Sequence, residues 1–289
     1  MNLITKKSII LPKRSPKSHK GDNGKVLVIG GSRDYVGAVA LAGLAALRSG
    51  VDWVTIAAPE KVGYAINSLS PDLVVKKYKG DDFCASRAKD ILKFEKEFDA
   101  VLIGNGIGMH AKSFVQKYVK ETTKPLVIDA DALKHISLYI VDKAILTPHA
   151  GELKALLENS KIDNSLLKKI FNEKNIEKKS LLIKKILNNN GLKNKKIIIL
   201  LKGPIDAIIS KDIIFYNKTG NEGMTKAGTG DVLAGLCVGY LGQHLSLLQS
   251  AINAAYFNGL AGDILLKKKK GFTYLASDLV EEIKKILYK

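Results

Sequence analysis

An aspartate that follows a glycine-rich turn is the residue in this sequence whose type and position best suit catalysis. The turn reads Gly228-Thr229-Gly230-Asp231 and leads directly into an apolar segment with helical spacing. The spacing predicts that a buried helix begins at Thr229 or Gly230. The free N–H groups of a first helical turn and the positive end of the helix dipole attract an anion, and glycines let its oxygen atoms approach the backbone closely.

Asp231 would repel an anion bound at this turn, so a chemical role explains it better than an electrostatic one. Its carboxylate would accept the proton of a hydroxyl group that attacks phosphorus. The N–H groups of Gly228, Thr229 and Gly230 would then form an anion hole for the transferred phosphoryl group. The alternative is an ordinary capped helix with a flexible entry loop, because short glycine motifs recur by chance.

The elements that must position this turn alternate regularly along the chain. We expect strands over residues 25–30, 51–57, 73–78, 99–103, 125–128, 144–146 and 196–201. We expect helices over residues 37–48, 82–94, 111–120, 245–266 and 277–288, and others that begin at Pro59 and near Thr147. This order predicts an α/β fold with a mostly parallel central sheet, right-handed crossovers and helices on both faces. An antiparallel pair over 205–209 and 212–217 would extend the sheet at one edge.

Several polar or glycine-rich turns follow the predicted strands, where α/β proteins bind their ligands. Gly30-Gly31-Ser32 follows the first strand, and a second glycine loop over 104–108 follows the fourth. Neither belongs to a GxGxxG dinucleotide motif. Asp129 and Asp131 come directly after the fifth strand, either as caps of a short helix over 131–136 or as ligand-facing, magnesium-linked acids.

Residues 160–196 are rich in lysine and asparagine, and they predict two amphipathic helices near 163–171 and 177–189. The apolar positions Leu166, Leu167, Ile170 and Phe171 recur at helical spacing, so one face should pack on the body of the protein. The strand pattern resumes directly afterwards. We therefore interpret residues 1–289 as one domain with a peripheral helical excursion that is dispensable for chemistry.

Composition limits the classes of function. The 289 residues are 46% hydrophobic and 26% charged, which is typical of globular proteins with a sizeable core. The net charge of +18 comes from 46 Lys and Arg against 28 Asp and Glu. No aromatic-interleaved basic motif, zinc ligand set or helix-turn-helix pattern accompanies it. We therefore expect a solvated surface that attracts anionic substrates, and no nucleic-acid partner.

The location of the protein is also constrained by the sequence. No apolar run is long enough to span a membrane, and the basic N-terminal segment lacks the features of a signal peptide. The two cysteines, Cys84 and Cys237, lie far apart in apolar or helical surroundings. This pattern predicts buried thiols in a reducing compartment, and hence a cytoplasmic protein without a membrane partner.

A set of short segments, in a fixed order, spans nearly the whole chain. They are His19-Lys20-Gly21, Gly30-Gly31-Ser32, Gly37-Ala38, and residues 103–108, 127–133, 146–152, 201–203 and 220–231. Together they resemble the ATP- or ADP-dependent (S)-NAD(P)H-hydrate dehydratases, a family with the ribokinase-like fold. The glycine turn before Asp231 is shared with ribokinase-like kinases. A kinase of a small alcohol, of the hydroxymethylpyrimidine or thiazole type, is therefore the alternative function.

The resemblance implies an enzyme that restores NADH and NADPH from their hydrated forms while it converts ATP to ADP or ADP to AMP. It implies that Asp231 is the catalytic base and that Glu152 organises Mg²⁺ through water. Taken alone, His149 would be a capped or satisfied core histidine, and Glu152 would be a first-turn acid that favours the helix dipole. The resemblance implies a substrate pocket lined by Ala38, Gly108, His149 and Asp231. It implies a nucleotide site formed by Lys202, Gly203, Pro204, Ile205, Asp206 and Gly230.

Four positions depart from the usual pattern of the family. Asn105, Ala150 and Glu222 stand where family members usually have proline, and we expect these changes to affect loop stiffness more than chemistry. Asp206 stands where family members usually have threonine, and it places an acid near the expected nucleotide. The resemblance also implies a homo-oligomer, such as a tetramer. Family members often carry an epimerase domain before this one, but the first predicted strand here begins at residue 25, so we expect that domain to be absent or encoded as a separate protein.

Overall fold

Short apolar, β-branched segments build a central sheet across residues 1–287, the part of the chain that the computed structural model describes. The described strands are β1 (Lys25–Ile29), β2 (Trp53–Pro59), β3 (Val74–Tyr78), β4 (Ala100–Ile103), β5 (Leu126–Ile128), β6 (Lys143–Leu146), β7 (Lys196–Leu201), β8 (Asp206–Ile209) and β9 (Ile214–Asn217). They lie in the order β3-β2-β1-β4-β5-β6-β7-β8-β9. The pairs from β3 through β7 are parallel, and β8 pairs antiparallel with both β7 and β9. The predicted parallel sheet with an antiparallel edge is confirmed.

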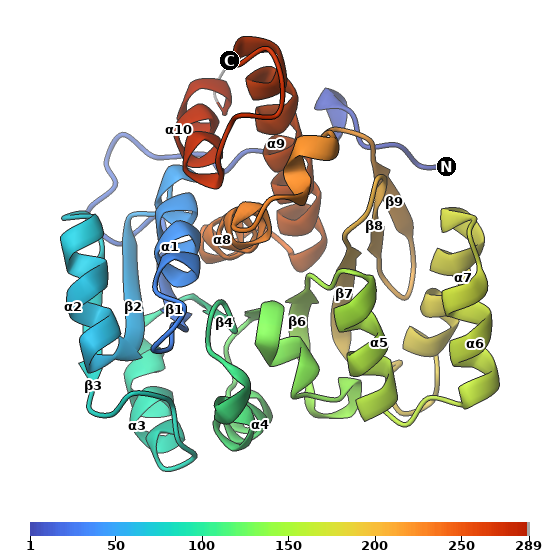
Figure 1. Cartoon of the computed structure of the whole chain (residues 1–289), viewed down its shortest axis with the longest axis horizontal. Coiled ribbons are helices and arrows are strands. Elements are labelled where there is room, and N and C mark those ends of the chain that lie inside the picture. Colours follow the sequence, from blue (N-terminus) through green and yellow to red (C-terminus); the bar gives the residue numbers. More distant parts are fainter. Residues whose placement is uncertain (288–289) are drawn as a thin grey trace.

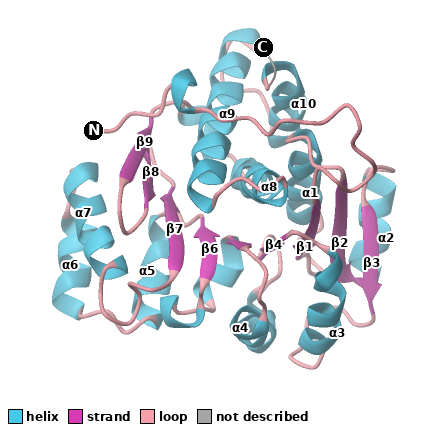
Figure 2. Ribbon diagram, turned by 180° about the vertical axis from the view of Figure 1, so that it is seen from behind, coloured by secondary structure: helices cyan, strands magenta, loops and turns pink. Residues whose placement is uncertain are grey.

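Helices cover both faces of this sheet, as Figures 1 and 2 show. The described α-helices are α1 (Gly37–Arg48), α2 (Glu60–Leu69), α3 (Arg87–Phe94), α4 (Lys112–Glu121), α5 (Ala150–Asn159), α6 (Asn164–Asn172), α7 (Ile176–Leu187), α8 (Thr229–Gly242), α9 (Leu247–Lys268) and α10 (Ala276–Ile286). Alternate residues of β1 enter opposite cores, with Val26 and Val28 on the side of α1, α8 and α9, and Leu27 and Ile29 on the side of α3, α4 and α5. Burial on both faces explains why these strands have continuous apolar sequences.

One helix begins clearly later than predicted. The helix predicted from Asp82 begins at Arg87, because Phe83 turns into the core and stacks on Phe114 with ring centroids 4.8 Å apart. The same turn leaves Cys84 exposed, so the prediction of a buried thiol there was wrong, whereas Cys237 is buried as predicted. The predicted limit of the last helix at Tyr288 lies outside the described residues.

The aspartates after β5 do not cap a regular helix. A short 3₁₀-helical segment, Ala130–Lys134, replaces the helix predicted over 131–136, and the Asp129 side chain makes no capping hydrogen bond to it. Asp129 is only 2% exposed and turns toward the sheet edge instead. The capping interpretation was therefore wrong, and the side chain of Asp129 belongs to the polar cluster described below.

The two helices predicted in the lysine-rich stretch are confirmed as α6 and α7. They lie beside the edge strands β8 and β9 (Figure 1). Leu167 and Ile170 are buried, and Leu166 and Phe171 pack partly against the same core. One apolar face therefore packs on the sheet, as the spacing predicts. Among residues 1–287, no helix combines the length and apolarity that crossing a membrane requires.

Candidate active site

The glycine turn before α8 forms the N-terminal end of a buried helix, as predicted. Gly228 precedes the helix with φ of +95°, a left-handed conformation that favours glycine. The Thr229 hydroxyl donates to the carbonyl oxygens of Met224 at 2.7 Å and Lys226 at 2.9 Å, which fixes the entry loop. The Thr229 N–H also donates to the Lys226 carbonyl oxygen, at 3.4 Å. Within the described chain, the N–H groups of Gly228 and Gly230 have no such backbone acceptor, so these two are available to an anion.

Helix α8 is held in place by close contact with α1. A Cβ atom on Gly235 would lie 2.2 Å from the carbonyl oxygen of Ala42, and one on Gly239 would lie 2.1 Å from the Ser49 Oγ atom. Only glycine allows these approaches. The small residues that the sequence places along this helix therefore serve helix packing, and they fix where its first turn meets the sheet edge.

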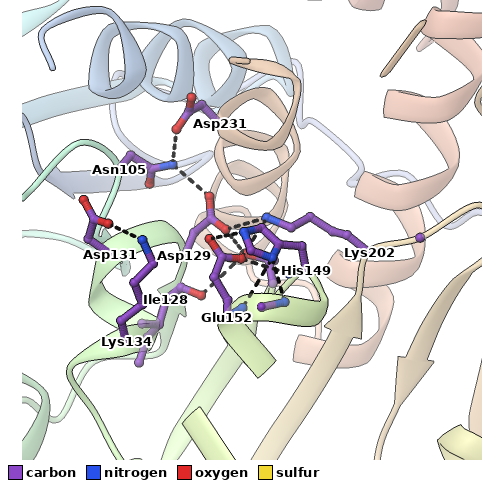
Figure 3. A network of polar contacts seen from close by, with 12 residues as sticks. Asn105, Ile128, Asp129, Asp131, Lys134, His149, Glu152, Lys202 and Asp231 are labelled. Atoms are coloured by element: carbon purple, nitrogen blue, oxygen red, sulfur yellow. Dashed lines mark hydrogen bonds and ion pairs between the residues drawn. The ribbon is translucent and has the colours of Figure 1, made fainter. Parts of the chain in front are cut away.

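Asp231 in the first turn of α8 faces the loop that follows β4. The Asn105 Nδ2 atom donates to Asp231 Oδ1 at 2.6 Å and to Asp129 Oδ2 at 3.0 Å (Figure 3). Burial, and to a lesser extent the charge of Asp129, raise the pKa of the Asp231 carboxyl to about 6, although the hydrogen bond from Asn105 opposes this. A carboxyl group with that pKa is suited to accept a proton near neutral pH.

A half-buried lysine joins two of the acids at the centre of the site. The Lys202 Nζ atom lies 3.1 Å from Asp129 Oδ1 and 3.5 Å from Glu152 Oε2. We call Lys202, Asp129 and Glu152 the Lys202 network. Burial alone would lower the pKa of Lys202, but the two carboxylates outweigh it and raise the pKa. The Thr147 hydroxyl donates to the same Asp129 oxygen at 2.7 Å. Hydrogen bonds and opposite charge together stabilise these buried ions.

His149 and Glu152 cap the start of α5. The His149 Nδ1 atom accepts from the N–H groups of Gly151 at 3.0 Å and Glu152 at 3.3 Å, and Glu152 Oε2 accepts from the His149 N–H at 2.9 Å. This reciprocal pair is a capping box, with histidine in place of the usual hydroxyl residue. The imidazole is half exposed, whereas burial raises the pKa of the Glu152 carboxyl.

The glycine loop after β4 lies against the first residues of α1. A Cβ atom on Gly106 would lie 3.4 Å from the Cβ atom of Ala38, and one on Gly108 would lie 3.4 Å from Ser32 Oγ. The Gly108 N–H donates to Asp131 at 3.2 Å, and Asp131 pairs with Lys134 at 2.8 Å. Ala38 and Gly108 therefore line one side of the sheet edge, on the β1 and β4 side of Asp231.

The turn after β7 lies on the other side. Gly203 and Pro204 are exposed, and Ile205 is partly buried. Asp206 closes this turn, because its carboxylate accepts from the Gly203 N–H at 3.1 Å and from Asn217 Nδ2 at 3.2 Å. Burial raises the pKa of the Asp206 carboxyl to about 6. The acid thus shapes the turn from within, which explains how an aspartate occupies this position.

The structure brings most of the predicted site residues to one edge of the sheet. A Cβ atom on Gly230 would lie 3.4 Å from the Lys202 Nζ atom, so the glycine turn and the Lys202 network adjoin each other. Sequence reasoning missed Asn105 and Thr147, whose side chains join the cluster. Their only signal was that each stands at the carboxyl end of a strand, where such residues gather.

Comparison with known proteins places the chain in a family. Residues 26–285 match the family model described as NAD(P)H-hydrate dehydratase. The chain belongs to the NAD(P)H-hydrate dehydratase family. An ADP-dependent (S)-NAD(P)H-hydrate dehydratase of Nitrosopumilus maritimus is 34% identical over 287 residues, which cover 96% of this chain and 93% of that protein.

Two further similarities describe the extent of the family resemblance. A bifunctional NAD(P)H-hydrate repair enzyme of Methanothermobacter thermautotrophicus is 39% identical over 96% of this chain, but the match covers only 52% of that protein. The chain therefore spans about half the length of this curated relative. The crystal structure of a Bacillus subtilis ADP/ATP-dependent NAD(P)H-hydrate dehydratase, co-crystallised with ATP and Mg²⁺, superposes with a TM-score of 0.80 at 27% identity, covering 98% of this chain and 96% of that one. These matches favour the dehydratase interpretation over the small-alcohol kinase.

Proposed function

We propose that this protein dehydrates hydrated NADH and NADPH and consumes ADP or ATP in the reaction. The observation that carries the proposal is the position of Asp231, a carboxylate at the glycine-lined start of α8, opposite the Lys202 network. An acid beside an anion site needs a chemical reason, and removal of a proton from an attacking hydroxyl supplies one. Membership of the NAD(P)H-hydrate dehydratase family supports the identity of the substrate.

The residues suit a two-stage reaction. Hydroxide is a poor leaving group, so the ring hydroxyl of the hydrate first attacks the terminal phosphoryl group of the nucleotide, and Asp231 accepts the hydroxyl proton. Phosphate then departs from the ring carbon, assisted by the lone pair of the ring nitrogen, and the neighbouring ring carbon loses a proton to water, which restores the double bond of the reduced nicotinamide. The N–H groups of Gly228 and Gly230 stabilise the charge on the transferred group. Thr229, whose N–H already points to Lys226, contributes mainly by holding the loop.

The nucleotide would lie on the β7 side of the site and the hydrate on the β1 and β4 side. Lys202 and the turn 203–206 hold the nucleotide, since an ammonium group beside an exposed glycine turn attracts phosphate groups. Ala38 and Gly108 line the pocket for the hydrate on the β1 and β4 side, and His149, at the start of α5 beside Glu152, borders it from the opposite side. In this arrangement the nucleotide and the hydrate approach Asp231 from opposite sides.

Magnesium fits the site through water. Within residues 1–287, no group of three or more His, Cys, Asp and Glu side chains is arranged to hold a metal directly. Mg²⁺ usually keeps several waters and needs only one or two carboxylates beside substrate phosphates. Glu152, a buried carboxylate next to Lys202, would hold the hydrated ion, which when bound neutralises phosphate charge.

The test is direct. Purified protein is incubated with NADH hydrate or NADPH hydrate and with ADP or ATP, and the absorbance of regenerated NADH or NADPH is followed. The proposal expects regeneration only when hydrate and nucleotide are both present. Nucleotide-dependent phosphorylation of a thiazole or hydroxymethylpyrimidine alcohol without dehydration would overturn it. We also propose a homo-oligomer, which measurement of molar mass in solution tests in the same preparation.

A further inference from the structure

The side chain of Asn105 occupies an unusual position between two carboxylates. It is fully buried, and its single amide nitrogen donates to Asp231 and to Asp129 at once (Figure 3). The two acceptors come from distant parts of the chain, one after β5 and one in α8. Because an amide group has two N–H donors, both bonds form from one nitrogen. Asn105 is therefore the link between the predicted base and the Lys202 network.

The orientation of this amide is fixed by its neighbours. A reversed amide would place its oxygen against two carboxylate oxygens, which repel it. The orientation that avoids this repulsion leaves Asn105 Oδ1 buried with no hydrogen-bond partner among the described residues. An unpaired buried oxygen destabilises a folded protein. Stability alone thus gives no reason for asparagine here, and the two bonds from Nδ2 to the acids supply one.

The backbone holds Asn105 rigidly. It lies between Gly104, with φ of +126°, and Gly106, with φ of +64°. A Cβ atom on Gly104 would lie 2.0 Å from the carbonyl oxygen of Asp129, and the Asn105 carbonyl itself accepts from the Gly31 N–H at 2.9 Å. The loop is thus packed against both neighbouring strand ends. A side chain on such a frame has little freedom to move, as an orienting group requires.

We propose that Asn105 is the positioning residue that orients the Asp231 carboxylate toward the reacting hydroxyl and keeps it ionised. The proposal rests on the function proposed above, in which Asp231 is the base. One Asp231 oxygen, Oδ1, is held by the amide, so Oδ2 is the atom left to accept the proton. The charged groups that face Asp231 are Asp129, Glu152 and Lys202, and of the side chains in residues 1–287 only Asn105 makes a direct hydrogen bond to its carboxylate.

The first test compares the pH dependence of Asn105→Ala with that of the parent. A hydrogen bond to the charged form lowers a carboxyl pKa. Its loss should move the acidic limb of kcat/KM upward by roughly one pH unit, the equivalent of one charge-assisted hydrogen bond. At neutral pH, kcat should fall about tenfold or more, while the Michaelis constant for the nucleotide stays within about twofold. An unchanged limb with unchanged kcat would overturn the role of Asn105.

The matched control is Asn253→Ala. Asn253 is as buried as Asn105, but it lies on α9 and its side chain bonds the backbone of Ile10 instead of an acid of the site. Its loss should lower the melting temperature without moving the pH profile. Asn105→Asp tests the donor itself, because it keeps the shape but sets a third carboxylate between the two. It should be less active than Asn105→Ala at neutral pH, and equal or greater activity would contradict the proposal.

A measurement that needs no turnover separates this proposal from the proposed function. The side-chain carboxyl of Asp231 is titrated by carbon-13 NMR in the parent and in Asn105→Ala, with its signal assigned by its loss in Asp231→Asn. A higher pKa in the Asn105 variant supports the positioning role, and an equal or lower pKa overturns it. If the parent fails to dehydrate hydrates, the proposed function falls, and the titration still decides what Asn105 does.

Discussion

The sheet edge around Asp231 and the helical pair α6–α7 both carry charged side chains, but the charges are buried and paired at the first and exposed to solvent on the second. In the Lys202 network one ammonium group pairs with two carboxylates whose side chains are only 2% and 6% exposed. In α6 and α7, lysines such as Lys168, Lys169 and Lys178 point into solvent, and the capping carboxylate of Asp163 is also exposed. The contrast teaches that the number of charges does not locate the chemistry. Shared partners and burial do, because buried ions persist only where the structure holds them.

Loss of the Asp231 carboxylate should have the largest effect. Asp231→Asn keeps the shape of the side chain but cannot accept the proton. We expect turnover to fall by roughly 10²–10⁴-fold, the usual contribution of a general base. Steady-state dehydration of NADH hydrate measures it, with a thermal melt as the control for folding. Turnover within about threefold of the parent would remove Asp231 from its proposed role.

Lys202→Ala should affect nucleotide binding next most strongly. The Michaelis constant for the nucleotide should rise roughly tenfold or more, as expected for one charge-assisted contact, and more than that for the hydrate. The protein should also be less stable, because Asp129 and Glu152 lose their shared cation. Lys154→Ala is the control, since Lys154 faces solvent and its ion pair in the described part of the chain is with Glu158, at 3.9 Å. A larger change in the hydrate constant would reverse the assignment of the two flanks.

The pH dependence distinguishes a buried functional acid from a surface one. Burial raises the pKa of Asp231 to about 6, so kcat/KM should fall as pH drops below about 6 and the carboxylate becomes protonated. Between about pH 4 and 6, this carboxyl is therefore still protonated in the folded protein but already ionised in the unfolded chain. Unfolding free energy contributed by this group therefore decreases as pH rises through that window.

Asp231→Asn removes this penalty, and the sign can be checked. The variant should melt at a higher temperature than the parent above pH 6 and at nearly the same temperature near pH 4. Melting curves of both proteins across this range make the comparison. A gain confined to acidic pH would contradict the raised pKa and the burial that causes it.

Charge reversal in the helical pair should have the smallest effect. Replacing Lys168, Lys169, Lys178 and Lys179 with Glu alters charges that are mostly solvated, and such charges contribute about 0–1 kcal/mol each. Turnover and molar mass should both stay unchanged, as measured by kinetics and light scattering. A large loss of turnover would show that the pair acts at the site, and a change of mass would show that it joins subunits.

Much of the architecture could be predicted from the sequence because it depends on local patterns. The strands themselves, the antiparallel edge and the start of α8 follow from periodicity, apolar runs and glycine turns, whereas the order of the strands in the sheet was not predicted. The cluster itself depends on contacts between residues that lie far apart, such as Asn105 and Asp231, which are 126 positions apart. Asn105 therefore read as a loop residue, and Asp129 was as consistent with a helix cap as with the site. The start of α3 could not be predicted for a similar reason. Phe83 packs against Phe114, a residue 31 positions away, and the helix begins only after it, at Arg87.

The glycine contacts between α1 and α8 also determine how the site can respond to its substrates. With Gly235 against Ala42 and Gly239 against Ser49, α8 lies so close to α1 that any side chain larger than hydrogen at either glycine would collide with it. The helix end that presents Gly228 and Gly230 is therefore held closely against the body of the protein. Any closure over the reactants must come from the turns around it, chiefly the exposed turn at Gly203 and Pro204. Variation that tunes turnover should therefore accumulate in those turns and spare the α1–α8 contact.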